Sequence, residues 1–409
     1  MPLVLQHPAH VFLRPAAHPV AWSRWPDAAP AASPAALLFA RSNALRGDVV
    51  GCLGRSTAKA FGVAPAAAPF VLGRVAADLT DQLARDGYQP GELPQLVAKA
   101  RRVDGLCRFA RSGMVSLSTT LPVALAAGAG ALAGAFVGAA AGGVGALVGA
   151  PVGAVVGAAA VAPAAAVLST AMYAVEARHR KGAEFTERVS RAPGKCRAMN
   201  SLAYASGTLA ANLPVTATQA ITSVGLASGL ATTAIWGGVG LLAAPAVALG
   251  GVGVRVAIQE ALITRAPARM LGLSGGKGPA GSIEWNPVTM LENMHRLRHR
   301  STAGLVVDDM RQFVKLLGRE LPGELRKAVH PHHGLKQTAL NAALLVGGQA
   351  LGQAAGMGTS AAGAPDAGAA ATARLVQHGP GAAAWGTGRP VAKHAKAGPP
   401  PLRMKGLAL

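Results

Sequence analysis

Few segments of this chain combine the residue types and spacing that catalysis requires. Residues 275–282, GGKGPAGS, place a lysine in a glycine-rich run, as a phosphate-binding loop does. A Walker motif also requires glycine at position 271, where Leu271 stands, and Ser or Thr after Lys277, where Gly278 stands. The segment therefore predicts no nucleotide site.

Histidines give two weak metal patterns. His295 and His299 are four residues apart, the helical spacing of two metal ligands, but neighbouring arginines repel a cation. We interpret them as part of a solvated basic face. The HPHH run at 330–333 offers no evident fourth ligand. We expect no metal site and no cofactor.

Acidic pairs are the remaining candidates for chemistry. Asp308-Asp309 and Glu320/Glu324 lie on predicted amphipathic helices, where paired carboxylates are usually solvated charges. No GxGxxG run follows a strand, and no spacing supports a catalytic triad. We therefore predict that the chain is not an enzyme.

Glycines repeat at a spacing that favours close helix packing. Steps of four residues place glycines along one shallow groove of a helix, where a second helix can approach closely. We interpret this pattern as a glycine zipper and predict these packing residues: Gly130, Gly134, Gly138, Gly142, Gly145, Gly149, Gly153, Gly157, Gly225, Gly229 and Gly237. The step of three from Gly142 to Gly145 indicates a turn at Gly142-Gly143.

Two long segments contain no charge at all. Residues 112–175 and 198–254 carry no Asp, Glu, Lys or Arg, although 14% of the whole chain is charged. A membrane span needs roughly 20 apolar residues, so each segment is long enough for a hairpin of two spans. A soluble all-helical protein with a core poor in large side chains is the alternative.

Basic residues flank both uncharged segments. Since cytoplasmic flanks collect Lys and Arg, an even number of crossings places all flanks on one side of a membrane. We expect anionic lipid headgroups to be the partner, through Arg101, Arg102, Arg108, Arg111, Arg178, Arg180, Lys181, Arg197 and Arg255. Nucleic acid is the weaker interpretation of the net charge of +21, because aromatic residues make up only 4% and no nucleic-acid-binding signature accompanies the charge.

Cysteine usage argues against a disulfide scaffold or a zinc site. The chain has three widely spaced cysteines, Cys52, Cys107 and Cys196. Cys107 and Cys196 each precede an uncharged segment, where either reversible acylation or a plain free thiol is compatible with the pattern.

The segments combine into an all-α fold with about four membrane spans in two glycine-zipper hairpins, basic amphipathic helical flanks and disordered termini. The predicted regions are 1–45 disordered, 46–111 basic helical, 112–175 first hairpin, 176–197 basic loop, 198–254 second hairpin, 255–356 basic helical and 357–409 disordered tail. Within the flanks, Pro69 and Asn286-Pro287 predict helix starts, and Pro322 predicts the end of a helix.

The composition of residues 120–254 resembles glycine-zipper segments of bacterial secreted proteins and pore-formers, and the N-terminus is similar to those of bacterial type III effectors. The resemblance implies a secreted virulence protein that inserts into a host membrane. We therefore expect a membrane-inserting protein that self-associates through its helices and permeabilises or remodels an acidic-lipid bilayer. The alternative is a membrane-anchored scaffold that presents the helices of 282–356 to a protein partner.

Overall fold

A computed structural model describes residues 34–61, 68–140, 144–188, 249–260, 265–275 and 283–332, with short stretches at 245–246 and between 334 and 354. These residues are mostly helical, in agreement with the predicted helical class. Residues 1–33, the core of the second predicted hairpin at 198–244 and the tail at 357–409 lie outside the described residues.

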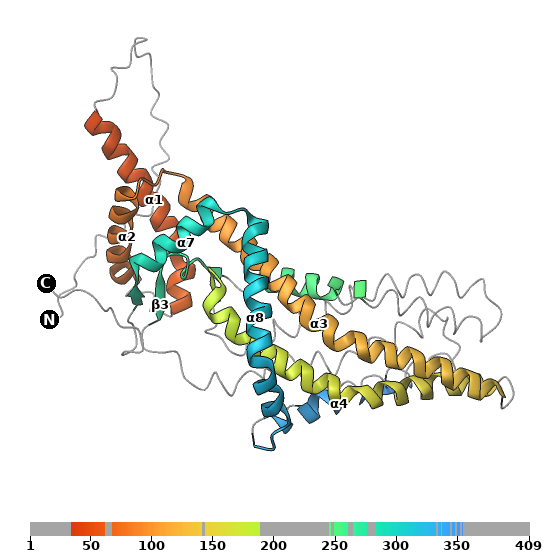
Figure 1. Cartoon of the computed structure of the whole chain (residues 1–409). Coiled ribbons are helices and arrows are strands. Elements are labelled where there is room, and N and C mark those ends of the chain that lie inside the picture. Colours follow the sequence, from red (N-terminus) through yellow and green to blue (C-terminus); the bar gives the residue numbers. More distant parts are fainter. Residues whose placement is uncertain are drawn as a thin grey trace, which may run out of the picture.

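A helical head is built from α1 (Pro34–Phe61), α2 (Ala68–Arg85), the first part of α3 (Glu92–Ala140) and α7 (Pro287–His299) (Figure 1). Their apolar residues recur every three or four positions, and together they form one buried core that includes Leu45, Val49, Leu53, Val75, Leu79, Leu83, Leu93, Val97 and Met294. Helix α2 begins one residue before Pro69, as predicted.

Two corrections concern this head. Helix α1 already begins at Pro34, so the prediction of disorder is wrong for residues 34–45, where Leu45 enters the core. Residues 92–111 belong to the predicted basic amphipathic flank, and their apolar side is covered by the core of the head rather than left open to a membrane surface.

Short two-stranded ladders close the end of the head. β1 (Glu187–Arg188) pairs antiparallel with β2 (Arg265–Ala266), and β3 (Leu273–Gly275) with β4 (Ile283–Trp285). Helix α7 then begins at the predicted cap, where the Asn286 side chain accepts hydrogen bonds from the backbone N–H of Val288 and Thr289. Gly272 has φ +67°, and a Cβ there would lie 2.1 Å from the Asn286 carbonyl oxygen, so the position requires glycine.

A long antiparallel hairpin extends away from the head. Helix α3 runs for 49 residues without interruption, and α4 (Val144–Ala183) returns beside it for 40 residues (Figure 1). The break falls at 141–143, as the glycine spacing predicts. Helix α4 continues to Ala183, so the predicted loop at 176–197 is helical in its first part, because Glu176 and His179 are buried there by neighbouring helices.

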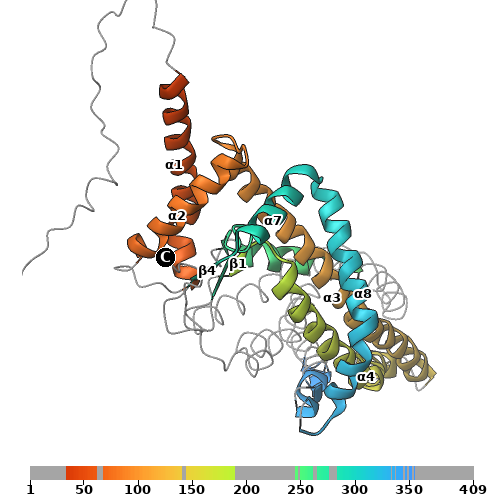
Figure 2. The same ribbon diagram turned by 60° about the vertical axis from the view of Figure 1, so that its left-hand side comes forward.

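Helix α8 (Thr302–Val329) lies across α3 and α4 (Figure 2). Phe313 and Leu317 of α8 pack on Val115 of α3 and on Met172 and Val175 of α4. The prediction that Pro322 ends this helix is wrong. Proline removes only one backbone donor, and Pro322 lies on the exposed side of α8, so the helix continues to Val329.

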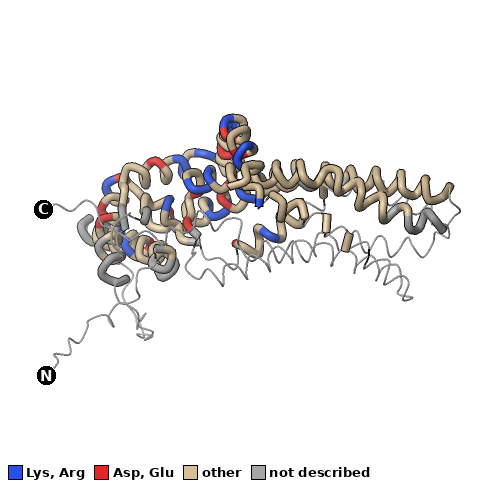
Figure 3. The backbone as a smooth tube through the Cα atoms, turned by 90° about the horizontal axis from the view of Figure 1, so that it is seen from below, with Lys and Arg blue, Asp and Glu red and all other residues tan. Residues whose placement is uncertain are grey.

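Charge divides the molecule along the hairpin. Figure 3 shows Lys, Arg, Asp and Glu gathered over the head and α8, whereas the projecting parts of α3 and α4 carry none. We call the projecting part of the hairpin, residues 112–140 and 144–171, the rod. The boundary between head and rod coincides with the crossing of α8.

Candidate functional site: the apolar rod and its charged junction

Within the rod, the backbones of α3 and α4 approach each other at glycines. A Cβ built on Gly134 would lie 2.0 Å from the carbonyl oxygen of Gly149, and one on Gly153 would lie 2.0 Å from that of Gly130. Gly157 meets Ala126 in the same way, at 2.1 Å. No side chain fits at these positions, so the helix contact requires glycine.

The predicted packing glycines divide into three groups. Gly130, Gly134, Gly149, Gly153 and Gly157 form the contact between α3 and α4, and Gly138 lies next to Gly149. Gly145 lies in α4. The others, Gly142, Gly225, Gly229 and Gly237, lie outside the described residues.

The outer surface of the rod is apolar and exposed. Val137 is 74% exposed, Phe136 71% and Val156 62%, and Leu125 and Val152 are also exposed. Helices α3 and α4 are both long and apolar enough to cross a membrane. In the most apolar window of α3 only 6% of residues are buried, whereas a core helix of a soluble protein is mostly buried.

At the base of the rod, two arginines of α3 are buried in a network of ion pairs. Arg108 and Arg111 are 2% and 0% exposed, and both donate to Oε1 of Glu184, at 2.9 and 3.1 Å. Arg111 also donates to both carboxylate oxygens of Asp309 on α8, at 2.7 and 2.8 Å. Arg108 reaches Glu260 at 2.8 Å.

This network joins the helices that meet at the junction. Asp309 additionally lies 3.0 Å from Nε2 of His179 on α4, so its carboxylate links α3, α4 and α8. Burial alone raises the pKa of Asp309, but the hydrogen bond from His179 and the charge of Arg111 outweigh it and lower the pKa. Asp309 is therefore held as a carboxylate between two donors.

A second buried acid, Asp104, holds the segment that follows α4. Its carboxylate accepts hydrogen bonds from the backbone N–H of Phe185 and Thr186, at 3.1 and 2.8 Å, and from the Thr186 hydroxyl at 2.6 Å. Burial, and after it the charge of Glu184, raise the pKa of Asp104, and these hydrogen bonds only partly offset both effects, so that the pKa is about 7.

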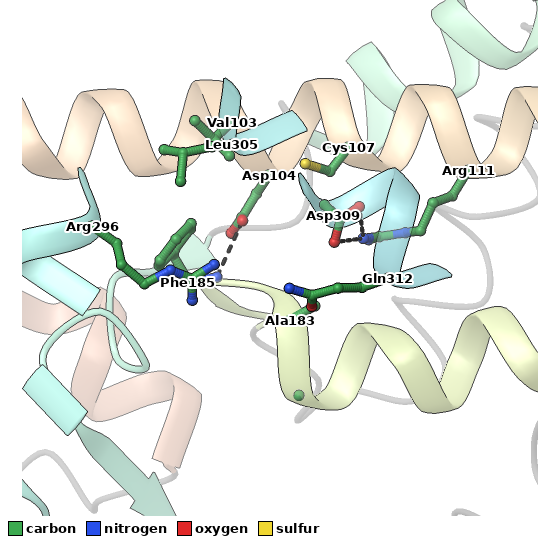
Figure 4. Close-up of a pocket in the computed structure, with 11 residues that line it drawn as sticks. Val103, Asp104, Cys107, Arg111, Ala183, Phe185, Arg296, Leu305, Asp309 and Gln312 are labelled. Atoms are coloured by element: carbon green, nitrogen blue, oxygen red, sulfur yellow. Dashed lines mark hydrogen bonds and ion pairs between the residues drawn. The ribbon is translucent and has the colours of Figure 1, made fainter. Parts of the chain in front are cut away.

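A small cavity lies among these groups. Figure 4 shows Asp104 directed toward Phe185, and Arg111 toward Asp309, around the space that Cys107, Arg296 and Gln312 also line. Its volume is about 60 Å³. Small-molecule sites usually measure roughly 300 Å³ or more, so this cavity accommodates a few waters rather than a metabolite.

The residues predicted to bind lipid headgroups differ in their exposure and in their pairing with carboxylates. The structure contradicts the prediction for Arg108 and Arg111, because both are buried and paired with carboxylates rather than open to headgroups. Arg101, Arg102, Arg178 and Lys181 are exposed, while Arg180 and Arg255 are partly buried. Arg178 is paired with Glu320 and Glu324 of α8. Arg197 lies outside the described residues.

Of the residues first considered for chemistry, Asp309 is the one that the structure places in the buried network at the base of the rod. The His295 and His299 rings are neighbours on α7, 4.3 Å apart, and the described residues contain no cluster of metal-ligating side chains. Lys277 lies outside the described residues. The prediction that Asp309 and Glu324 are solvated is wrong, since both are buried and paired with basic residues.

Cys107 is buried, and desolvation raises the pKa of its thiol. A buried thiol that stays protonated is a poor acceptor for acylation, so the free-thiol alternative is the one compatible with this environment.

Sequence reasoning missed the buried network, although a signal for it exists. Asp104, Arg108 and Arg111 are spaced by four and three residues, which places them on one side of α3 together with the buried Ala100 and Val115. Charges on the apolar side of a helix indicate buried ion pairs.

A scan against protein-family models, a search of curated proteins and a search of solved structures each found no match.

Substitution of single glycines tests the close contact in the rod. We expect Gly134→Ala and Gly153→Ala each to destabilise the folded protein in mild detergent by about 1–3 kcal/mol, because the added Cβ separates the two backbones. Gly182→Ala in α4 is the control, since its Cβ meets no atom within 4 Å. Equal thermal unfolding of all three variants contradicts the contact.

Adjacent aspartates provide a matched test of the junction. Asp309→Asn removes the closer of the two carboxylates that pair with the buried Arg111 and is expected to lower the free energy of unfolding by about 3–5 kcal/mol. Asp308 pairs with the more exposed Arg300, so Asp308→Asn is expected to cost less than about 1 kcal/mol. Denaturant unfolding measures both, and similar losses show that Asp309 has no special role.

Asp104 predicts a pH dependence of stability. Its pKa is about 7 in the folded protein against 3.8 for the unperturbed group. Between these pH values, the folded protein keeps a proton on Asp104 that the unfolded chain has released. Stability therefore falls as pH rises from about 4 to 7, by up to about 1.4 kcal/mol per pH unit from this group. Asp104→Asn should flatten this part of the unfolding profile; parallel profiles refute the assignment.

Proposed function

We propose that the chain is a membrane-inserting protein whose α3–α4 rod crosses a bilayer containing anionic lipids, with the head at one surface. The observation that carries this proposal is the exposed apolar surface of the rod. Exposed Phe136, Val137 and Val156, on helix segments without a charge, are costly in water but favourable in hydrocarbon.

The dimensions of the rod support the same proposal. Residues 112–140 form a helix of about 40 Å at 1.5 Å per residue, against roughly 30 Å of hydrocarbon. The helix is therefore long enough to cross the hydrocarbon and to extend into the headgroup regions, which bring the bilayer to about 40–45 Å. Both helices return to one head, so the rod enters and leaves the bilayer on one side.

The glycine contacts favour an anchor over an assembly that permeabilises the membrane. The glycine zipper already packs α3 against α4 of the same chain, through Gly130, Gly134, Gly149 and Gly153. Their groove is therefore filled and is not available to a second copy. This favours the membrane-anchored scaffold, in which the head and α8 are presented to a partner at the membrane surface.

Two valines of equal exposure test insertion. Val156 in the rod and Val288 at the start of α7 are each 62% exposed, so arginine at either position is tolerated in water. In hydrocarbon, Val156→Arg is expected to weaken insertion by about 2.5–3.5 kcal/mol, while Val288→Arg has no effect. Flotation with vesicles of phosphatidylcholine and phosphatidylserine measures both.

Equal flotation of the two variants overturns the proposal. The same vesicles, loaded with a dye, distinguish a membrane anchor from a permeabilising assembly. An anchor inserts without releasing the dye, whereas a permeabilising assembly releases it.

A further inference from the structure

We propose that α8 is an interfacial helix that lies in the plane of the membrane and binds anionic lipid through an apolar ridge, Val307, Val314 and Leu321, flanked by Arg311 and Lys315. The proposal deepens the proposed function and rests on it. It assigns the lipid contact to residues outside the set predicted from the flanks of the uncharged segments.

Helix α8 crosses the hairpin at the boundary between the head and the rod. Its contacts to Val115 on α3 and to Met172 on α4 fall within one or two turns of Ser112 and Val175, where the uncharged segments begin and end. Figure 1 shows α8 crossing both helices between the head and the rod. If the rod lies in hydrocarbon, α8 lies at the interface.

The side of α8 that faces the membrane follows from its contacts with the head. Leu305 belongs to the core of the head, and Asp309 and Gln312 line the junction cavity, so this side of α8 faces the head. At 100° per residue, Val307 and Val314 lie about 140–160° around the helix from Gln312. The ridge is therefore on the side of α8 that faces the rod.

That side of α8 carries a row of apolar residues. Val307 and Val314 are 56% and 50% exposed and lie seven residues apart. Leu321 continues the same line and packs partly against the core between α8 and the hairpin. Such a row of apolar side chains along a surface helix is the feature that interfacial helices bury at the boundary of headgroups and acyl chains.

Basic side chains near the ridge indicate that an anionic bilayer is what it contacts. Arg311 and Lys315 are exposed and lie about 60° and 100° around the helix from Val314, and neither has an ion pair among the described residues. Long basic side chains at such positions extend to lipid phosphates, at about 1 kcal/mol each near an anionic surface. An anionic bilayer therefore matches both the apolar ridge and its basic neighbours.

The segment after α8 continues this arrangement. The Asn341 side chain donates to the Thr170 hydroxyl on α4, 3.0 Å away, so the chain returns to the hairpin on the rod side of the junction. Leu335 and Leu340 are exposed in this segment.

An environment-sensitive fluorophore distinguishes the sides of α8. Single cysteines replace Val314 on the ridge, Arg319 on the opposite side and Val156 in the rod, and each full-length variant is labelled with an NBD group. The unsubstituted protein, labelled in parallel, gives the background from the native cysteines. Vesicles of phosphatidylcholine with and without phosphatidylserine are then added.

We expect a several-fold rise in fluorescence with a blue shift at Val156→Cys and Val314→Cys on the anionic vesicles, and no rise at Arg319→Cys. A rise at Val156→Cys without one at Val314→Cys overturns the interfacial helix and leaves the proposed function standing. Equal rises at Val314→Cys and Arg319→Cys also overturn it, because α8 is then not in the interface plane. No rise at Val156→Cys overturns the proposed function itself.

Discussion

The architecture depends on the pairing of Arg108 and Arg111 at the last charged turns of α3. Both guanidinium groups are removed from water, and an unpaired buried charge is prohibitively unfavourable, so Glu184 and Asp309 must meet them. This requirement fixes the position of α3 against α4 and α8. The same ion pairs mark the end of the charged part of the hairpin. Beyond them, residues 112–140 of α3 and 144–171 of α4 carry no charged side chain.

The glycine contacts impose the same register from the other end of the hairpin. Gly134 meets Gly149 and Gly130 meets Gly153, and no other residue fits where the backbones touch. Under the proposed function, the two kinds of contact hold helices together in two different solvents. In a water-facing head, apolar burial and paired charges hold the helices. Lipid would provide no hydrophobic force between the helices of the rod, so close packing at glycines would have to hold them.

Local and periodic features of the fold could be predicted from the sequence. The break between α3 and α4, the cap at Asn286 and the helix start at Pro69 each follow from a few adjacent residues. Features that depend on tertiary contacts were not predicted. Arg108 and Arg111 have the composition of a membrane flank, and only their partners, 73 or more residues away along the chain, bury them. Asp309 was missed for the same reason.

Under the proposed function the rod lies within a bilayer, while the head and α8 remain at its surface. Alkaline carbonate extraction of membranes from cells that express the full chain tests it most directly, because carbonate removes peripheral proteins and retains those with helices in hydrocarbon. With the rod in hydrocarbon, the protein is expected to stay in the membrane pellet. Complete release into the soluble fraction contradicts it.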